Sequence, residues 1–391
     1  MTVFEPGRLG PLTLRNKVIK AATFEGRTHK GRVSDGLIDF HEEVAAGGVG
    51  MTTVAYCAVS PAGRVNPHCL VLGPDTVPRL RELTDRVHAQ GALASAQLGH
   101  AGYVADQMSN KTRSVAPSTR FSPPAKGIVR AASVADLTRV RGEFASAARF
   151  GVAAGFDCLE IHLGHNYLLS SFLSPNLNKR KDAYGGSLAN RAAFPRDVVK
   201  AVRDAVGSEV AVIAKLNMDD GVKAGLHLEE SIAFAHLLQE DGCLDALELT
   251  GGSSLLNGMF FFRGDVPMKE FVASQPKALA PFVKVVLKRI LPSYPFEEGF
   301  FLPMAREFLA ALDLPLILLG GINERATMES AIDEGFAFVA MARALLREPD
   351  LLLRMQAEQT AAGVCIHCNK CAPTIYERGG TRCVVRTPAS P

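Results

Sequence analysis

The sequence lacks the features that would assign it to a membrane or a nucleic acid. In its 391 residues no apolar run reaches the roughly 18 residues that a membrane-spanning helix needs, and the first residues have no charged segment followed by an apolar one. The 43 basic and 40 acidic residues nearly balance, and no basic tract stands out. We therefore expect no membrane and no nucleic acid as partners, and we expect a cytoplasmic protein.

Internal repeats, low-complexity tracts and a separate Rossmann fingerprint with its acidic residue are absent as well. The composition is that of a globular chain, because 47% hydrophobic and 21% charged residues supply enough apolar material for a large core. The length fits either two or three average domains or one large α/β barrel. The pattern of the elements has to decide between these.

Short aliphatic and β-branched runs recur along the chain, and each is followed by helical spacing. The expected strands are Val18–Thr23, Met51–Tyr56, Leu93–Leu98, Cys158–His162, Val210–Leu216, Ala246–Thr250, Leu316–Gly320 and Ala337–Ala342. The expected helices are Asp35–Ala46, Val77–Gln90, Val134–Ala154, Leu188–Val206, Leu228–Gln239, Leu302–Ala311, Glu324–Glu334 and Pro349–Ala361. Several strand runs, such as VAVIAKL, are continuously apolar, which indicates parallel strands covered on both faces.

Eight such units in series indicate an α/β protein with a (β/α)8 TIM barrel, because an open doubly wound sheet usually has five or six strands. We expect the barrel over residues 1–347, followed by a C-terminal helix and a short cysteine-rich extension over 348–391. Ser133 and Asp136 fit a capping box, and Asn323 is expected to cap the helix that follows it. Long loops over 100–130 and 251–299 are expected to be lids or binding loops.

The loop after the fourth expected strand places His162, His165 and Tyr167 together at a strand end, where barrels carry their chemistry. Two imidazoles that donate to one oxygen would stabilise negative charge there, and the phenol would supply a proton. A metal site and ordinary packing remain as alternatives. A metal would need a further ligand, and we expect Glu160 to point the other way.

Two further groups of residues indicate a phosphorylated ligand with a flat, polar-edged ring. Gly320 and Gly321 follow the seventh strand, and Ala342 and Arg343 follow the eighth, where barrels commonly bind phosphate. Glycines that merely turn the chain are the alternative. Lys215 and Gln97, both inside otherwise apolar strands, would neutralise an anionic edge and hold a heterocycle, unless the lysine only extends its charge to the barrel rim.

Several segments together resemble a known family. They are LRNKVIKAAT, AVSPAGR, AQLGHAG, HLGHNYLLSSFLSPNLNKRKDAYGGSLANR, LILLGGI and the final AR of VAMAR. The chain resembles the old yellow enzyme family of FMN-dependent ene-reductases over nearly all of residues 3–383. It is most similar to the bacterial branch that includes the barrel domain of 2,4-dienoyl-CoA reductase and trimethylamine dehydrogenase.

The resemblance implies an FMN site and roles for individual residues. Ala21, Ala22, Thr23 and Ala58 would lie against the flavin, Gln97 would bind its pyrimidine edge, Lys215 would lie near N1 and O2, and Gly320, Gly321, Ala342 and Arg343 would hold the phosphate. His162 and His165 would grip a substrate carbonyl, and Tyr167 would protonate the α-carbon. The sequence departs from the family pattern at Lys215, where Arg is typical, at Asn166 and Ala342, where Gly is usual, and beside Phe24, where Thr or Cys often tunes the flavin.

Half of the eight cysteines are clustered near the end of the sequence. Cys365, Cys368, Cys371 and Cys383 have spacings suited to a [4Fe–4S] cluster or to a tetrahedral zinc ion, and free or redox-active thiols are the third alternative. In the resembling branch a similar quartet holds a [4Fe–4S] cluster. The scattered Cys57, Cys69, Cys158 and Cys243 are expected to be small buried hydrophobic residues.

The sequence therefore predicts an FMN-dependent oxidoreductase that NADH or NADPH reduces and that transfers hydride to an activated alkene, such as an α,β-unsaturated carbonyl compound, in a ping-pong scheme. A small-molecule substrate is the expected partner, and a homo-oligomer is compatible with the sequence. One alternative is a flavin dehydrogenase that passes electrons through a C-terminal iron–sulfur cluster. Others are a flavin redox sensor without turnover and, on the same barrel, a metal-dependent aldolase or hydrolase.

Overall fold

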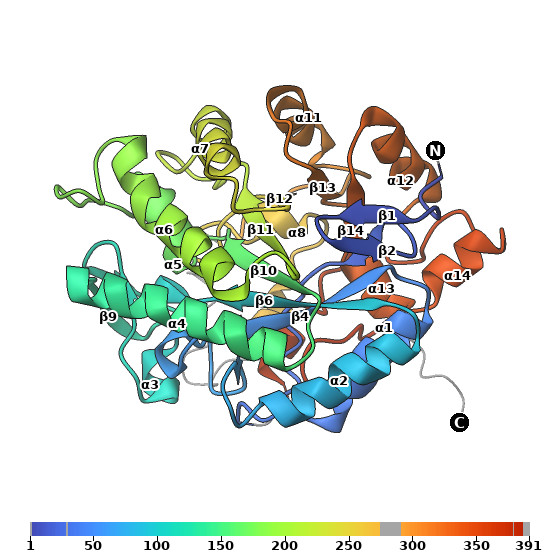
Figure 1. Cartoon of the computed structure of the whole chain (residues 1–391), viewed down its shortest axis with the longest axis horizontal. Helices are drawn as coiled ribbons and strands as arrows, with labels where there is room; N and C mark the ends of the chain where they lie inside the picture. Colours follow the sequence, from blue (N-terminus) through green and yellow to red (C-terminus); the bar gives the residue numbers. More distant parts are fainter. Residues whose placement is uncertain (1, 29, 274–290, 378, 386–391) are drawn as a thin grey trace.

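The computed structural model describes residues 2–28, 30–273, 291–377 and 379–385. Eight parallel strands form a closed barrel surrounded by helices (Figure 1). The barrel strands are β3 (Val18–Lys20), β4 (Met51–Ala58), β6 (Leu93–Gly99), β10 (Cys158–Leu163), β11 (Ala211–Asn217), β12 (Ala246–Thr250), β13 (Leu316–Leu319) and β14 (Phe338–Met341). Strand β14 pairs with β3 and β3 pairs with β4, which closes the ring. The (β/α)8 TIM barrel and its eight predicted strands are confirmed.

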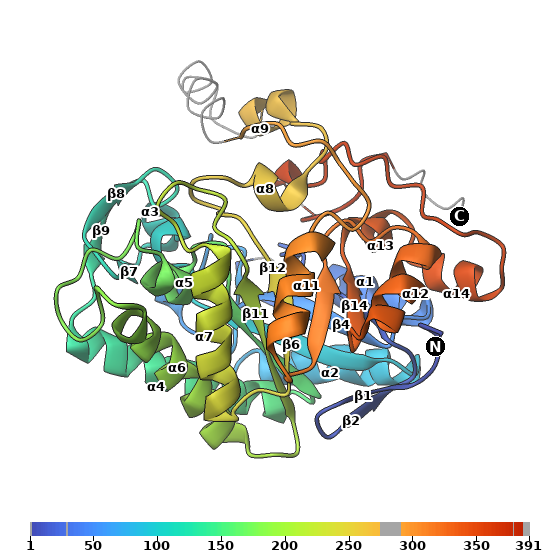
Figure 2. The same ribbon diagram turned by 90° about the horizontal axis from the view of Figure 1, so that it is seen from above.

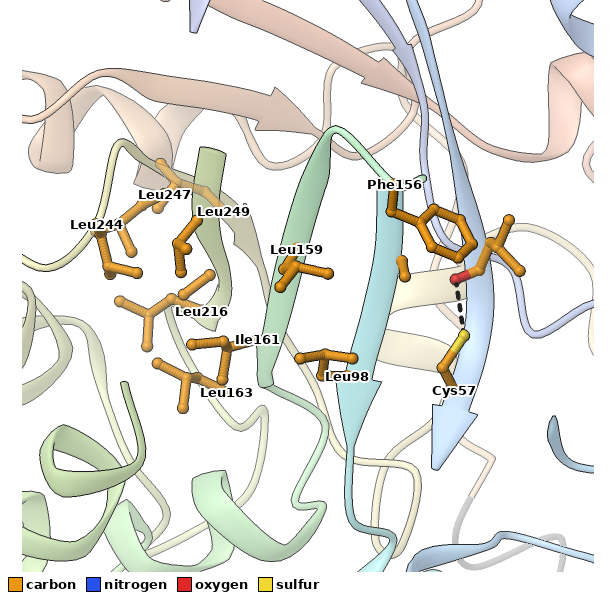
Figure 3. Packing of buried hydrophobic residues seen from close by; sticks show 14 of the residues in the cluster. Cys57, Leu98, Phe156, Leu159, Ile161, Leu163, Leu216, Leu244, Leu247 and Leu249 are labelled. Carbon is orange, nitrogen blue, oxygen red and sulfur yellow. Dashed lines mark hydrogen bonds between the residues drawn. The ribbon is translucent and has the colours of Figure 1, made fainter. Parts of the chain in front are cut away.

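Alternation along each strand divides its side chains between the barrel interior and the surrounding helices. Leu159, Ile161 and Leu163 of β10 belong to the large core cluster outside the barrel, together with Leu216 and Leu249 of neighbouring strands (Figure 3). The intervening positions of β10, β11 and β12 face inward. Both faces of these strands are therefore buried, which explains why their sequences read as continuous apolar runs.

The surrounding helices follow the predicted ones closely. They are α1 (Asp35–Ala46), α2 (Val77–Ala89), α4 (Val134–Ala153), α6 (Leu188–Val206), α7 (Leu228–Asp241), α11 (Leu302–Ala311), α12 (Arg325–Glu334), α13 (Arg343–Arg347) and α14 (Leu351–Gln356). Helix α14 is shorter than predicted, and α13 was not predicted. Within the described ranges, no helix has both the length and the apolar character required to cross a membrane.

One predicted helix cap is confirmed and one is wrong. Ser133 and Asp136 form the reciprocal capping box at the start of α4. Asn323 does not cap α12, because the helix begins one residue later and the Asn323 side chain donates instead to the carbonyl of Gly363 at 2.9 Å. The carboxylate of Glu298, which is distant in the sequence, accepts the backbone N–H of both Asn323 and Glu324.

The two ends of the barrel are closed by different structures. At the N-terminal end, the hairpin of β1 (Gly7–Leu9) and β2 (Leu12–Leu14) packs Leu9 and Leu14 into one cluster with the interior side chains Met51 and Ile213. The opposite end carries α8 (Met259–Phe262), α9 (Met268–Ala273) and the C-terminal segment (Figure 2). The interior is therefore apolar at its base and accessible to chemistry at its C-terminal end.

The loop after β6 forms a small structure beside this end. It contains α3 (Gln107–Asn110) and a three-stranded sheet of β7 (Val115–Ala116), β8 (Arg120–Ser122) and β9 (Gly127–Ala131). The loop after β10 continues into α5 (Leu168–Leu173), and β5 (Leu70–Val71) is added beside β4. The predicted lid over 251–299 lies partly outside the described residues, which omit 274–290.

Candidate active site

His162, His165 and Tyr167 gather at the C-terminal end of β10. His162 occupies an inward position of the strand, and Tyr167 immediately precedes α5. The ring of His162 lies 5.1 Å from that of His165 and 4.7 Å from that of Tyr167, measured between centroids. Tyr56, which the sequence did not indicate, completes the group with its ring 5.4 Å from Tyr167. Two imidazoles and two phenols therefore share one corner of the barrel mouth.

The loop that presents His165 is held in an uncommon conformation. His165 and Asn166 have φ values of 59° and 57°, in the left-handed region that Asn tolerates better than most residues. The backbone N–H of His165 donates to Asn217 of β11 at 2.9 Å, and its Nε2 lies 3.0 Å from Thr250 Oγ1 of β12. Strained backbone that neighbouring strands hold in place is typical of functional sites.

Burial keeps the candidate catalytic groups neutral. It lowers the pKa of His165 to about 3 with a further contribution from the Lys215 cation, and burial, His165 and Lys215 hold the pKa of His162 well below its usual value. Burial also raises the pKa of Tyr167 above its ordinary range. His162 Nδ1 is buried and has no hydrogen-bond partner among the described residues. The group thus offers neutral N–H donors and a phenol that retains its proton.

The floor beneath these residues consists of charged side chains. Lys215 Nζ lies 3.0 Å from Glu160 Oε1 and 2.9 Å from Glu248 Oε1, and Gln97 Nε2 donates to Glu160 Oε1 at 2.5 Å. The expectation that Glu160 points away from His162 was wrong, since residues two apart on a strand face the same side. Glu248 was missed, although its place in the apolar run ALELT carried the same signal as Lys215.

A second buried network underlies the segment proposed to contact the flavin. Lys20 pairs with Glu25 at 2.5 Å and donates to Thr23 Oγ1 at 3.0 Å, while the N–H of Ala55 donates to the other oxygen of Glu25 at 2.6 Å. Burial opposes ionisation of Glu25, but Lys20 and His41 hold its pKa below the usual range. The network joins the segment after β3 to β4, which ends at the buried Ala58.

Gly320 and Gly321 follow β13 with φ values of 112° and 75°. A Cβ at these positions would meet the rings of Phe301 and Phe300 at 2.5 and 2.6 Å, so packing and backbone conformation already account for both glycines. The cationic groups are therefore the better indication of a phosphate.

Two arginines near this turn lack carboxylate partners within the described residues. Arg343 donates to Asn369 Oδ1 and to the carbonyl of Arg263, and burial lowers its pKa. The guanidinium of Arg263 lies over the rings of Phe260, Tyr294 and Phe300, and its buried Nε has no partner. Two guanidinium groups without carboxylate partners among the described residues fit a doubly charged anion such as a phosphate. The sequence did not indicate Arg263, which lies in the long loop.

The four clustered cysteines line one cavity. The cavity is small, about 20 Å³, and is bordered by Cys365, Cys368, Cys371, Cys383 and Arg343. No group of three or more His, Cys, Asp or Glu among the described residues is positioned around a single metal ion. This gives the predicted metal at the His pair no support.

The cysteine segment is attached to the barrel mouth. Thr381 donates its hydroxyl to the carbonyl of Phe24 at 2.6 Å and its N–H to the carbonyl of Glu25 at 2.7 Å. The scattered cysteines Cys57, Cys69, Cys158 and Cys243 are buried and free, as predicted.

Comparison with known proteins agrees with this geometry. Residues 2–247 match the model of the NADH:flavin oxidoreductase / NADH oxidase family. The chain is 64% identical over 385 residues to a 4,4'-dithiodibutanoate disulfide reductase of Rhodococcus erythropolis, a match that covers 98% of this chain and 95% of that protein.

Solved structures share the fold. The chain superposes on 2-naphthoyl-CoA reductase with a TM-score of 0.84 at 22% identity, over 98% of this chain and 56% of that one. It superposes on the old yellow enzyme homologue of Zymomonas mobilis with a TM-score of 0.74 at 23% identity, over 97% and 99% of the two chains. The chain belongs to the NADH:flavin oxidoreductase / NADH oxidase family of FMN proteins, to which the old yellow enzymes also belong.

Proposed function

We propose that this chain is an FMN-dependent NAD(P)H oxidoreductase that reduces the activated C=C bond of α,β-unsaturated carbonyl compounds. The observation that carries the proposal is the corner formed by His162, His165 and Tyr167, which combines two neutral imidazoles with a protonated phenol above the barrel interior. These are the groups that polarisation of a carbonyl and protonation of the adjacent carbon require.

The residues present fit FMN. Arg343 and Arg263 offer paired guanidinium groups to the phosphate beside Gly320, Gly321 and Ala342. Gln97 and Lys215 would face the ring from the barrel floor, and Ala21, Ala22, Thr23 and Ala58 would lie along it. FMN, when bound, supplies the hydride that the substrate receives, and NADH or NADPH restores it.

The chain's own groups would do the rest of the chemistry. His162 and His165 would donate N–H groups to the carbonyl oxygen of the substrate, which draws electron density from the β-carbon. The Thr250 and Asn217 contacts hold His165 in place for this role. Tyr167 would give its proton to the α-carbon. The overall reaction balances as NAD(P)H, one proton and the alkene giving NAD(P)+ and the saturated product.

Reduction of an organic disulfide is a second candidate, which the 64% identical disulfide reductase favours. There, one NAD(P)H and one proton would convert a disulfide into two thiols. The same groups would serve, because the imidazole N–H donors would stabilise a leaving thiolate and Tyr167 would protonate it.

Parallel assays separate the two candidates. Purified protein would be assayed for bound FMN and for NADH and NADPH oxidation without oxygen, with 2-cyclohexenone or 4,4'-dithiodibutanoate as the acceptor. We expect bound FMN and turnover of the enone to its saturated ketone. Turnover of the disulfide alone would select the second candidate, bound FMN without turnover of either would indicate a flavin redox sensor, and failure to bind FMN would contradict both enzymatic proposals.

We further propose that Cys365, Cys368, Cys371 and Cys383 bind a [4Fe–4S] cluster, in a C-terminal unit over 348–391 that follows a barrel over 1–347. The spacing of the four cysteines and the cavity that they share support this proposal. Iron and sulfide assays on anaerobically purified protein should find about four of each per chain. Stoichiometric zinc without iron, or no metal, would contradict it. If iron and sulfide are found, the alternative that the enzyme oxidises a substrate and passes its electrons through the cluster can be tested.

A further inference from the structure

The floor of the barrel mouth contains more acid than its single cation can balance. Glu160, Lys215 and Glu248 come from the three adjacent strands β10, β11 and β12, and all point into the barrel. All three side chains are buried, with at most 2% of each exposed. Glu160 Oε2 and Glu248 Oε2 have no hydrogen-bond partner among the described residues, and the contact of Glu248 Oε1 is its ion pair with Lys215.

The charges around the floor do not remove this excess. Lys20 and Glu25 face it from the β3 side as a closed ion pair, with His41 beside Glu25. Burial keeps His162 and His165 neutral above it, and burial raises the pKa of the Cys158 thiol below it. The described residues of β13 and β14 contribute no ionisable side chain. With both glutamates ionised, the floor would carry one uncompensated negative charge in a buried site, which is costly.

We propose that Glu248 carries a proton at neutral pH, so that the floor beneath the ring-binding site is neutral as a whole. Glu248 is then a positioning residue that determines how much of the Lys215 charge reaches a ligand above it. The geometry supports this proton, because one ammonium group faces two buried carboxyl groups that lie within 3.0 Å of it. The inference rests on the proposed FMN site for its effect on the flavin, but not for the proton itself.

The electrostatics of the cluster agree with this assignment. Burial raises the pKa of Glu248 to about 8, while Lys215 opposes this rise and the Glu160 carboxylate adds to it. Burial opposes the charge of Lys215, but the two carboxyl groups raise its pKa. The proton therefore resides on Glu248 at neutral pH, and Glu160 is the carboxyl group that both Lys215 and Gln97 contact.

The charge of the floor should change how readily a bound ring is reduced, if that ring becomes negative on reduction. While Glu248 is protonated, Lys215 and Glu160 cancel and the floor does not oppose that charge. Once Glu248 ionises above about pH 8, the floor becomes negative and disfavours the reduced form. Reduction should therefore become harder with rising pH than it would be above a permanently neutral floor.

Infrared spectroscopy tests the proton without reference to FMN chemistry. The protein would be produced in cells supplied with isotopically labelled glutamate, which separates the glutamate bands from those of the flavin. As purified, it should show the carbonyl stretch of a protonated carboxyl group at about pH 6.5. The band should disappear above about pH 9 and be absent from Glu248→Gln. Glu307→Gln, at an exposed position of α11 with no ion pair, is the matched control. A band missing from the wild type, or one that persists in Glu248→Gln, would overturn the proposal.

Potentiometry of the FMN-loaded protein tests the consequence. Wild type and Glu248→Gln should have the same midpoint potential at about pH 6.5, whereas at about pH 9 the variant should favour the reduced form by on the order of tenfold, or about 30 mV for two electrons. If the variant does not fold, Glu160→Gln should show the same divergence. The tuning role would be refuted if the infrared band is present but the midpoint potentials of the wild type and the variant depend on pH in the same way. Failure to bind FMN would refute the proposed function and leave the infrared result to decide the proton.

Discussion

The two candidate centres at the C-terminal end of the barrel differ in how their groups are held. His162, Lys215 and Glu248 stand on neighbouring parallel strands, and side chains from those strands fix them in a buried interior. The cysteines have much less support. Residues 363–369 form neither helix nor strand, and the four thiols are only partly buried. The barrel centre is therefore organised before any ligand binds, whereas the cysteine segment depends far more on what it holds.

The two centres are nevertheless connected. Arg343 borders the cysteine cavity from the start of α13, and Thr381 bonds to the backbone at Phe24 and Glu25 beside the barrel mouth. A change in one region can reach the other through these contacts. Substitutions that separate the two regions therefore provide the sharpest tests of the difference between them.

Removing the floor cation should produce the largest effect. Lys215→Met leaves the Glu160 carboxylate buried without a counter-charge beside the protonated Glu248, and breaking a buried pair in this way costs about 3 to 5 kcal/mol. The free energy of unfolding should fall by about that amount near neutral pH. Because both acids would be protonated more readily in the folded state than in the unfolded state, the loss should shrink as the pH falls. Denaturant titrations at several pH values would measure it.

The matched control is the double variant Lys215→Met with Glu160→Gln. It removes the carboxylate that Lys215 balances and should recover part of the lost stability, since the remaining Glu248 carboxyl group is protonated and neutral. Equal destabilisation of the single and double variants would show that packing of the lysine stem, rather than charge, accounts for the loss.

The proton donor should be the next most sensitive position. Tyr167→Phe keeps the ring but removes the phenol proton, and loss of a general acid typically slows a reaction by about 100-fold to 10,000-fold. Reduction of the flavin by NAD(P)H should change little, because that step needs no proton from the phenol. Rapid-mixing measurements would follow the two half-reactions separately.

Tyr56→Phe is the control for this substitution. The Tyr56 hydroxyl already bonds to the carbonyl of Gly63 at 3.2 Å and is buried against the chain. We expect it to slow the oxidative half-reaction much less than Tyr167→Phe does. Similar effects of the two substitutions would argue against Tyr167 as the proton donor.

Substitution of a clustered cysteine should change the iron content and leave the flavin site unchanged. Cys371→Ser should abolish the bound iron, while the FMN content and its reduction by NAD(P)H stay close to wild type, because the floor and the His corner stand on strands. Cys243→Ser, at a buried cysteine far along the sequence, should leave the iron unchanged. Loss of FMN together with iron would show that the Thr381 contacts make the barrel mouth depend on the tail.

The fold was predictable because its signals are local and repeated. Each barrel strand is an apolar run with a helix after it, and even the bounds of α1 and α6 follow from the spacing. The arrangement of charges within the barrel was less accessible. Glu160, Lys215 and Glu248 occupy inward positions, but their partners come from other strands, and only the pairing of β10, β11 and β12 brings them together. Arg263 could not be found, because irregular loops carry no periodicity to place a side chain.

The smallest predicted effect is that of pH on substrate affinity, because we expect almost no change. An exposed imidazole loses its charge near pH 6.5, whereas burial lowers the pKa of His165 to about 3 and keeps His162 neutral as well. Neither should titrate between about pH 5 and 8, so the affinity for a neutral enone should be constant over that range. Below about pH 6.5 the unfolded chain binds protons at these imidazoles, whereas the folded protein does not. The free energy of unfolding should therefore decline as the pH falls below that value. Binding titrations of an enone at fixed ionic strength would test the flat profile. A rise in affinity below pH 6.5 would show that an imidazolium, rather than a neutral imidazole, grips the substrate oxygen.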